Sequence, residues 1–473
     1  MNKYRRQVLL LLFIIFLFIG PITNQGQASE INPRPLAHDL HVYSPAEDQS
    51  KMTPVSGPRE KLPDEITLRQ ALSLALMHNP ELAASTWDVL SGKARSVQAG
   101  LFPNPELEVE VENFGGSRKV ENPDGSSDRV RRFDEAETTV ALSQLIELGG
   151  KRSKRKQVAA SEQGLLRWDF ETKRLDLITK VTNAFIDLLA LQERMVLTDG
   201  LVELFQDVFN AISERVNAGK VSPVEATRAK VALSTIQIEQ ERVKRELEAS
   251  RKRLAATWGS NTPGFERASG TLETFPDLPP YESLISRISQ NPEIARWDSE
   301  IEQREAALSL EKAKRYPDVT LSGGVRYLDE SNDQTYVMGI SLPLPLINRN
   351  QGGMLEATYG LQKAKQARMA AEVNTISALD ETYQTLLSAS AQVTALRNTI
   401  LPGAEAAFNA SNEGYREGKF GYLNVLDAQR SLFDAKDTYI NSLLAYHKAL
   451  TAIERLISEN LHTIEPLQTS KTE

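Results

Sequence analysis

An internal duplication is the feature of this sequence that most limits how it can fold. The same landmarks return in the same order in the two halves of the 473-residue chain. The matched positions are Asn79-Pro80-Glu81-Leu82 with Asn291-Pro292-Glu293-Ile294, Pro105 with Pro317, Ser143 with Ser341, and Gly219-Lys220 with Gly418-Lys419. The spacing between copies falls from 212 to 198 residues only between Pro105 and Ser143. The first half therefore carries a longer loop there, and otherwise both halves repeat one frame.

Within each half the hydrophobic period changes from 3.6 residues to 2 and back again. Residues 66–102 and 281–315 are predicted to be helical, and two alternating segments then follow in each half. These predicted strands cover about 105–114 and 136–146 in the first repeat, and about 317–327 and 334–343 in the second. Loops rich in Gly, Asn, Asp and Ser, near 113–134 and 328–334, close each pair as a hairpin.

A long helical stretch follows each hairpin. Residues 151–217 and 351–416 are dense in strong helix formers, and at 1.5 Å per residue each stretch would extend ~100 Å. Each one ends at a Gly-Lys turn, and a shorter helix then returns to about residue 258 or 458. Pro402 lies inside the second stretch and predicts a bend or a break there.

Segments of other kinds flank the two repeats. Lys3, Arg5 and Arg6 precede an apolar run and small residues up to Ala28, which is the pattern of a cleaved export signal. The apolar run is shorter than the roughly 20 residues that a membrane-spanning helix needs. We divide the chain into a signal peptide 1–28, an irregular N-terminal segment 29–65, a first repeat 66–258, a linker 259–280, a second repeat 281–458 and a C-terminal tail 459–473.

Composition removes several classes of function. The chain has no cysteine, which excludes disulfides, thiolate metal sites and a cysteine nucleophile. Its formal net charge of −8 argues against a nucleic-acid ligand. Only His38-x-x-His41 has a spacing typical of metal ligands, and Gly149-Gly150-Lys151 lacks the earlier glycine of a phosphate-binding loop. We therefore expect no enzyme activity, no cofactor and no metal site.

The predicted strands alternate between an apolar and a polar face. In the first strand one face carries Leu107, Val109 and Val111, and the other carries Glu106, Glu108, Glu110 and Glu112. Strands of this length and period match the wall of a transmembrane β-barrel. Because the smallest such barrels have about eight strands, several chains would have to share one. The four glutamates would then line the lumen. The alternative is two ordinary amphipathic hairpins packed on a soluble core.

Two sequence motifs carry a family resemblance. Residues 143–152 read Ser-Gln-Leu-Ile-Glu-Leu-Gly-Gly-Lys-Arg after the second strand, and residues 342–352 read Leu-Pro-Leu-Pro-Leu-Ile-Asn-Arg-Asn-Gln-Gly after the fourth. With the duplicated order and the Gly-Lys turns, the chain from about 66 to 458 resembles the TolC-like outer membrane factors. The second motif resembles their cobalt-zinc-cadmium (CzcC-type) branch.

The resemblance implies a mainly helical fold with a membrane β-barrel part. Three chains would form a homotrimer whose twelve strands close a barrel in the outer membrane lipid of a Gram-negative bacterium, on a long α-helical barrel in the periplasm. The implied partners are a periplasmic adaptor protein and an inner-membrane pump of the resistance-nodulation-division class. The implied function is a passive exit duct for divalent heavy-metal cations.

The resemblance also implies a gate at the periplasmic tip. In the family, acidic residues and a tyrosine-centred bond between helices close the tip next to the glycine turns. The matching positions here are Tyr415, Asn424, Asp427 and Glu225, beside the tip turns Gly219-Lys220 and Gly418-Lys419. Asn424 stands where an aspartate is usual, so one of two carboxylate rings would consist of amides. The local alternatives are an ion pair of Asp427 with Arg430, and a favourable place for Glu225 in a first helical turn.

Two other functions stay open from the sequence. The same duct could carry organic compounds or a secreted protein, because the choice of cargo lies with the pump. Alternatively, the chain could be a soluble periplasmic coiled-coil adaptor or structural rod without a barrel. The paired alternating strands argue against this last alternative.

Overall fold

The computed structural model describes residues 36–37, 39–45, 62–114, 117–121, 123–131, 136–274 and 280–461. All of them belong to one unit, Arg34–Glu473. The predicted signal peptide, His38 and most of the predicted tail lie outside the described residues.

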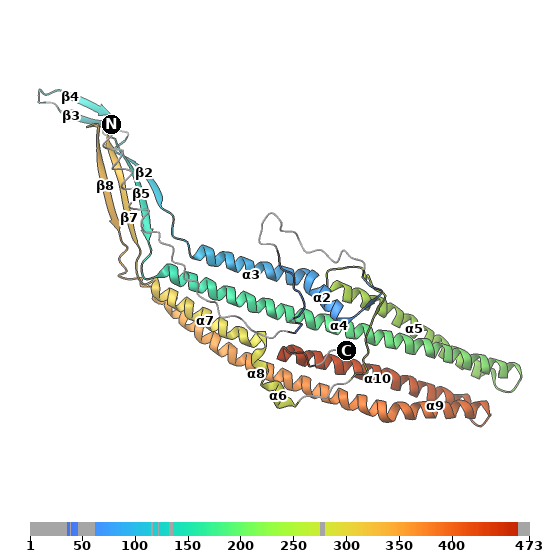
Figure 1. The fold of residues 1–473 in the computed structure, drawn as a ribbon. Coiled ribbons are helices and arrows are strands. Elements are labelled where there is room, and N and C mark those ends of the chain that lie inside the picture. The colour runs from blue at the N-terminus through green and yellow to red at the C-terminus, as the bar shows by residue number, and fades with distance from the viewer. Residues whose placement is uncertain are drawn as a thin grey trace, which may run out of the picture. The chain divides into compact units, whose positions relative to one another are not determined.

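The first repeat runs from helices through strands into a long helix and a returning helix (Figure 1). Its elements are β1 (Glu65–Ile66), α2 (Leu68–His78), α3 (Pro80–Ala99), β2 (Glu106–Glu112), β3 (Ser117–Glu121), β4 (Ser127–Arg131), β5 (Glu137–Ile146), α4 (Lys151–Asn217) and α5 (Pro223–Ala256). The predicted strands are confirmed as β2 and β5, and the predicted long helix is confirmed as α4.

The prediction that 113–134 is only a loop is wrong. Strands β3 and β4 pair within it as a separate antiparallel hairpin. Between them, Gly125 has a φ of 83° and the backbone amide of Ser126 donates to the Asp124 carboxylate at 2.9 Å. An Asp-Gly pair is a strong hairpin signal because glycine accepts positive φ without strain. That signal was present in the sequence.

The second repeat follows β6 (Arg267–Ala268), a short strand in the linker that pairs with β1. Its elements are α6 (Tyr281–Ile285), η2 (Ile288–Gln290), α7 (Pro292–Ala313), β7 (Val319–Leu328), β8 (Asp333–Ser341), α8 (Gln351–Ala395), η3 (Leu396–Ile400), α9 (Leu401–Arg416) and α10 (Tyr422–Ile457). The predicted strands of this repeat are confirmed as β7 and β8.

The predicted bend or break near Pro402 takes the form of one π-helical turn between α8 and α9. The helix from Gln351 widens into one π-helical turn, η3, and Pro402 follows in the first turn of α9. A proline in a helix lacks the N–H that would donate to the carbonyl four residues earlier, and its ring crowds that carbonyl. A wider turn accommodates both effects, so the chain continues from α8 into α9 without a loop.

The repeated Asn-Pro motif joins two helices in the same way in each half. Asn79 caps α3, and its side-chain amide donates to the Thr257 carbonyl just after α5 at 2.8 Å. Asn291 caps α7, and its amide donates to the carbonyl of Leu456 in the last turn of α10 at 2.9 Å. Both asparagines are buried. Each one therefore satisfies backbone groups at one helix start and one helix end.

Strands from both halves form one four-stranded antiparallel sheet in the order β2-β5-β7-β8. The central pairing, β5 with β7, joins the two repeats, and its register places Ile146 opposite Val319. Gly324 makes this pairing close, because a Cβ there would lie 2.4 Å from the Val140 carbonyl oxygen. The duplication is thus completed by a sheet that neither half could build alone.

The residues after the second strand form a pinned turn from sheet to helix. Gly149 has a φ of 69°, and a Cβ there would lie 2.8 Å from the Tyr316 ring. Asp318 accepts from the Leu148 backbone at 3.0 Å and from the Lys151 ammonium at 2.8 Å. The Gly-Gly-Lys sequence therefore ends β5 and starts α4, in agreement with the absence of a phosphate-loop spacing.

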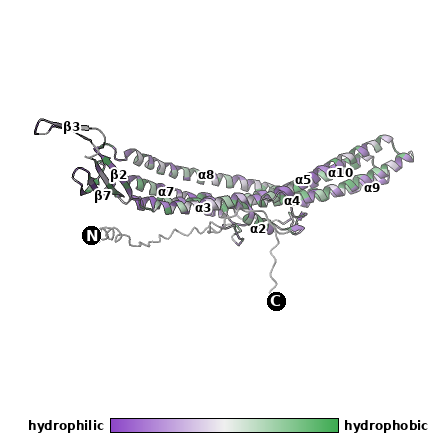
Figure 2. Cartoon of the chain, turned by 90° about the horizontal axis from the view of Figure 1, so that it is seen from above, coloured by the Kyte–Doolittle hydropathy of each residue, from purple (hydrophilic) through white to green (hydrophobic). Residues whose placement is uncertain are grey.

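Helices α3, α4, α7 and α8 pack in that order, and α10 packs against α4, α8 and α9. The largest hydrophobic core lies around α4, where Phe185, Ile186 and Leu188 are fully buried. Hydrophobic and hydrophilic residues are interleaved along these helices (Figure 2). Among the described residues, no helix combines the length and the apolar character that membrane crossing would require.

Candidate functional site

The register of the sheet gathers most polar residues of its four strands on one face. Glu106, Glu108, Glu110 and Glu112 lie opposite Ser143, Ala141, Thr139 and Glu137, respectively. Thr139 in turn lies opposite Arg326, which lies opposite Thr335. The four glutamates form an uninterrupted row along the edge strand β2, and all four are exposed. We call them the glutamate row.

The other face of the sheet is apolar and uncovered. It carries Leu107, Val109, Val111, Val140, Leu142, Leu321, Val325, Tyr336, Met338 and Ile340. Met338 is 90% exposed, and all ten side chains are more than 40% exposed. A patch of this extent on a water-soluble protein would be a liability, whereas lipid covers such a surface favourably.

The two edge strands of the sheet each have one neighbour in the described part of the chain. Strand β2 pairs with β5 and strand β8 pairs with β7. Because every pairing is antiparallel, β2 and β8 themselves run in opposite directions. Their open backbone edges are therefore complementary between copies of the chain.

The tip turns are confirmed as glycine-terminated helix ends. Gly219 and Gly418 have φ values of 69° and 77°. The amide of Lys220 donates to the Arg215 carbonyl at 2.9 Å, and that of Lys419 donates to the Gly414 carbonyl at 2.7 Å. These bonds satisfy the last carbonyls of α4 and α9, and glycine supplies the left-handed conformation that they require.

Tyr415 lies at the centre of the tip, where the helices of both repeats meet. It is 5% exposed and stacks edge-to-face on Tyr422, with ring centroids 6.2 Å apart. The Arg215 guanidinium of α4 lies 4.6 Å from the Tyr415 ring centroid and donates to the Tyr415 carbonyl at 2.8 Å. Burial raises the pKa of Tyr415, Arg215 opposes that shift, and the nearby Glu225 carboxylate adds to it.

Glu225 faces this cluster from the first turn of α5. One of its carboxylate oxygens, Oε2, is buried without a hydrogen-bond partner, as are the hydroxyls of Tyr415 and Tyr422. Burial also raises the pKa of Tyr422; Tyr415 and Glu225 add to this shift, and Arg430 opposes it. The structure therefore brings Tyr415 and Glu225 together across the two repeats.

The other two residues singled out by sequence lie elsewhere at the tip. Asn424 and Asp427 are exposed on α10. Within the described residues no ion pair joins Asp427 to Arg430. Sequence reasoning also missed Arg215, since nothing local shows that a side chain of α4 will reach α9.

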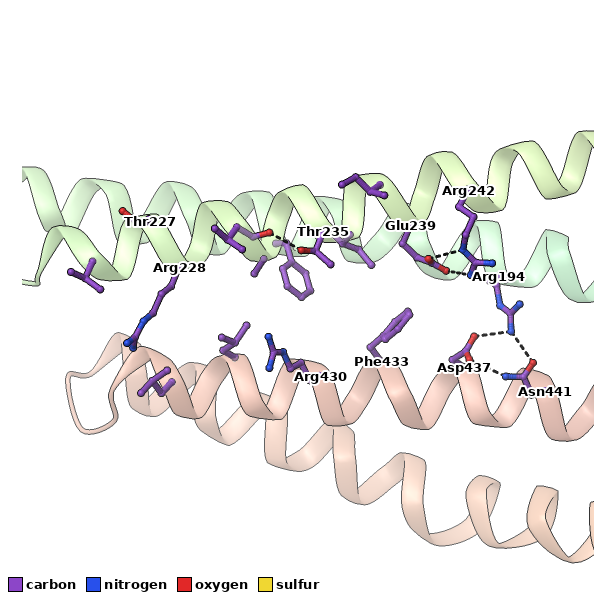
Figure 3. A pocket seen from close by; sticks show the side chains of 18 residues that line it. Arg194, Thr227, Arg228, Thr235, Glu239, Arg242, Arg430, Phe433, Asp437 and Asn441 are labelled. Atoms are coloured by element: carbon purple, nitrogen blue, oxygen red, sulfur yellow. Dashed lines mark hydrogen bonds and ion pairs between the residues drawn. The ribbon is translucent and has the colours of Figure 1, made fainter.

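A groove of about 1070 Å³ separates α5 from α10 behind the tip (Figure 3). Arg194 of α4 bridges it at the end away from the turns, pairing with Asp437 at 2.8 Å and donating to Asn441 at 2.8 Å. Its other walls are apolar and basic, with Val224, Val231, Leu423 and Phe433 beside Arg228 and Arg430. Figure 3 shows Arg228 reaching from α5 toward α10.

Metal-ligand groupings are absent from the part of the chain that the structure describes. No set of three or more His, Asp or Glu side chains there could hold an ion. His447, the buried histidine of α10, instead donates from Nε2 to the Leu272 carbonyl at 2.8 Å. The His38-x-x-His41 pair is only partly described.

Comparison with known proteins identifies the class of this fold and sheet. The family model "Outer membrane efflux protein" matches residues 71–260 and 285–459. The chain is 34% identical to the cobalt-zinc-cadmium resistance protein CzcC of Cupriavidus metallidurans over 86% of this chain and 93% of that protein. It is 24% identical to the pyoverdine export outer membrane protein OpmQ of Pseudomonas aeruginosa, over 82% and 84% of the two chains. The crystal structure of CusC superposes with a TM-score of 0.68 at 16% identity, covering 83% and 92% of the two chains.

The architecture is that of a TolC-like outer membrane channel. The chain belongs to the outer membrane efflux protein family, and its place is the outer membrane of a Gram-negative cell. This excludes the soluble periplasmic rod considered from the sequence.

Proposed function

We propose that this chain is the passive exit duct of a tripartite efflux system for divalent heavy-metal cations. The 34% identity to CzcC over 86% of the chain carries the proposal. The glutamate row on the polar face of the sheet agrees with a cationic cargo, because carboxylates along a lumen attract cations and repel anions.

A homotrimer explains the open edges of the sheet. Pairing β2 of one copy with β8 of the next keeps the ladder antiparallel, and three copies supply twelve strands for one closed barrel. Closure would place the apolar face in lipid and the glutamate row in the lumen. Helix α8, next to β8, carries an exposed apolar stripe that would face the next copy: Leu355, Tyr359, Met369, Val373 and Ile376.

The tip is the proposed gate. Tyr415 and Glu225 join the two repeats, and Asp427 and Asn424 lie exposed on α10 beside them. In a trimer, Asp427 would form a ring of three carboxylates that repel one another and attract cations. Opening would separate α9 and α10 from α4 and α5, which breaks the contact between Arg215 and Tyr415.

The partners of the duct follow from the same proposal. The chain has no nucleotide-binding motif in its sequence. An inner-membrane resistance-nodulation-division pump would therefore supply the energy for transport. A periplasmic adaptor would join the two at the tip. The groove between α5 and α10 is apolar, and at its tip end Arg228 and Arg430 make no ion pair with any described residue. Such a groove suits a helical partner that carries acidic residues.

Deletion of the gene tests the cargo. Tolerance to zinc, cobalt and cadmium should fall, whereas tolerance to organic compounds should stay unchanged. The similarity to the pyoverdine exporter OpmQ favours organic cargo as the second candidate. Loss of tolerance to organic compounds alone would select that candidate and overturn the metal assignment.

Paired substitutions test the gate. Glu225→Ala with Asp427→Ala should raise the ion leak through the reconstituted channel in planar bilayers. Glu241→Ala, an exposed residue of α5 away from the tip, is the matched control. Unchanged conductance in the double variant would remove these residues from the gate.

A further inference from the structure

We infer that Arg326 sets the ion selectivity of the outer part of the duct by drawing Glu112 and Glu137 against the sheet. The inference rests on the proposed duct and adds a selectivity-determining residue to it. Only the pairing of β2, β5 and β7 shows this arrangement, since Arg326 is far from both glutamates in sequence.

Arg326 reaches from the centre of the sheet toward the β2 edge. Its guanidinium donates to the Glu137 carboxylate at 2.8 Å and to the Thr139 hydroxyl at 3.0 Å. It also pairs with Glu112 at 3.3 Å. Glu112 and Glu137 are themselves paired across β2 and β5, so one guanidinium holds two adjacent carboxylates.

The rest of the polar face is different. Arg326 is the only basic side chain on this face among the described residues of β2, β5, β7 and β8. Glu106, Glu108 and Glu110 have no basic partner in the described part of the chain. Their cross-strand neighbours are small, namely Ser143, Ala141 and Thr139. No ion pair in the described part of the chain therefore offsets the formal charges of these three glutamates.

The arrangement makes two levels of charge along the polar face. Toward the helices, Glu106, Glu108 and Glu110 present three free carboxylates per chain. Toward the loops, Asp333 of β8 lies at the same level as Glu112 and Glu137, so these three carboxylates and Arg326 present a formal charge of −2 per chain instead of −3. A cation moving outward would leave a strongly acidic section for a weaker one, which favours its release.

Arg326 could instead only tie three strands together. Variants that differ in net charge distinguish these two roles. A structural role depends on the hydrogen bonds of the guanidinium, whereas the electrostatic role depends on the sum of the charges in the group of Arg326 and the three carboxylates. Arg326→Gln changes the formal charge of this group from −2 to −3. Arg326→Gln with Glu112→Gln returns it to −2 without the guanidinium, and Glu112→Gln with Glu137→Gln makes it 0.

The experiment measures reversal potentials of the full-length trimer in planar bilayers under a salt gradient. Arg326→Gln should raise the cation-to-anion permeability ratio about two- to fivefold, as expected for one charge per chain within a Debye length of the passing ions. The charge-restored double variant and Arg326→Lys should match the wild type. The variant Glu112→Gln with Glu137→Gln should have a lower permeability ratio than the wild type.

Each other outcome speaks against the inference. An unchanged ratio in Arg326→Gln, or a charge-restored variant that behaves like Arg326→Gln, would reduce Arg326 to a structural tie. If Arg326→Gln fails to assemble, the permeability ratios of Arg326→Lys and of Glu112→Gln with Glu137→Gln still decide the question. A wild-type protein that forms no conducting pore would overturn the proposed duct itself, and the inference with it.

Discussion

The two returning helices, α5 and α10, occupy the same place in the duplication but pack very differently. In α10, 18 of 36 residues are buried, whereas in α5 only 7 of 34 are. Helix α10 packs against α4, α8 and α9, while α5 packs mainly against α4. Helix α5 also exposes Val224, Val231 and Ile238 at a seven-residue spacing. Equal position in a repeat thus does not give equal burial, because neighbouring elements decide which face is covered.

The largest expected effect separates these two helices directly. Ile453→Asp in α10 places an unpaired charge at a fully buried site and should destabilise the chain by about 4 kcal/mol or more. Ile238→Asp in α5, where the side chain is 72% exposed, should change stability by no more than about 0.5 kcal/mol. Thermal unfolding in detergent, followed by helical circular dichroism, measures both. Equal losses would mean that α5 has a partner within the assembly.

A second prediction asks whether the strands of the two repeats are equivalent in lipid. Val109→Lys in β2 and Met338→Lys in β8 both lie on the apolar face and should each cost about 2–4 kcal/mol of assembly. Glu108→Lys on the opposite face is the control and should assemble normally. Trimer yield on native gels reports the effect. Normal yield for the apolar-face variants would show that this face does not meet lipid.

The repeated asparagine caps should give nearly equal, smaller losses. Asn79→Ala and Asn291→Ala each remove a cap and a buried donor, so we expect about 1–2 kcal/mol from each. Asn261→Ala, at an exposed turn in the linker, is a comparison site outside the helix junctions. Melting temperatures of the three variants measure these stability losses. Clearly unequal losses at Asn79 and Asn291 would show that only one junction depends on its asparagine.

The smallest effect comes from a histidine found only in the more buried helix. Burial lowers the pKa of His447, and its bond to the Leu272 carbonyl opposes this shift only in part. Since the unfolded chain then takes up a proton that the folded chain does not, stability should fall as pH drops below about 6.5. His447→Gln should show a shallower fall between pH 7 and pH 5.5. Parallel curves for the two proteins would remove His447 from the pH response.

Local signals predicted most of the fold. Asn-Pro at helix starts, glycine at the tip turns and a two-residue period in the strands act over a few residues, and α3, α4, β2 and β8 followed them. The Asp-Gly turn of β3 and β4 was also readable. The candidate site was less accessible, because Tyr415 and Glu225 were matched only through a family pattern and Arg215 and Arg326 were not found at all.

The sequence by itself determined the duplicated order of elements, the two faces of each strand and the positions where helices stop, because these depend on contacts between near neighbours. Only the tertiary structure decided that β5 pairs with β7, that α10 is buried and α5 exposed, and that Arg326 meets Glu112 and Glu137. These contacts join residues separated by much of the chain. Their energies depend on register and packing between elements, which no local pattern records.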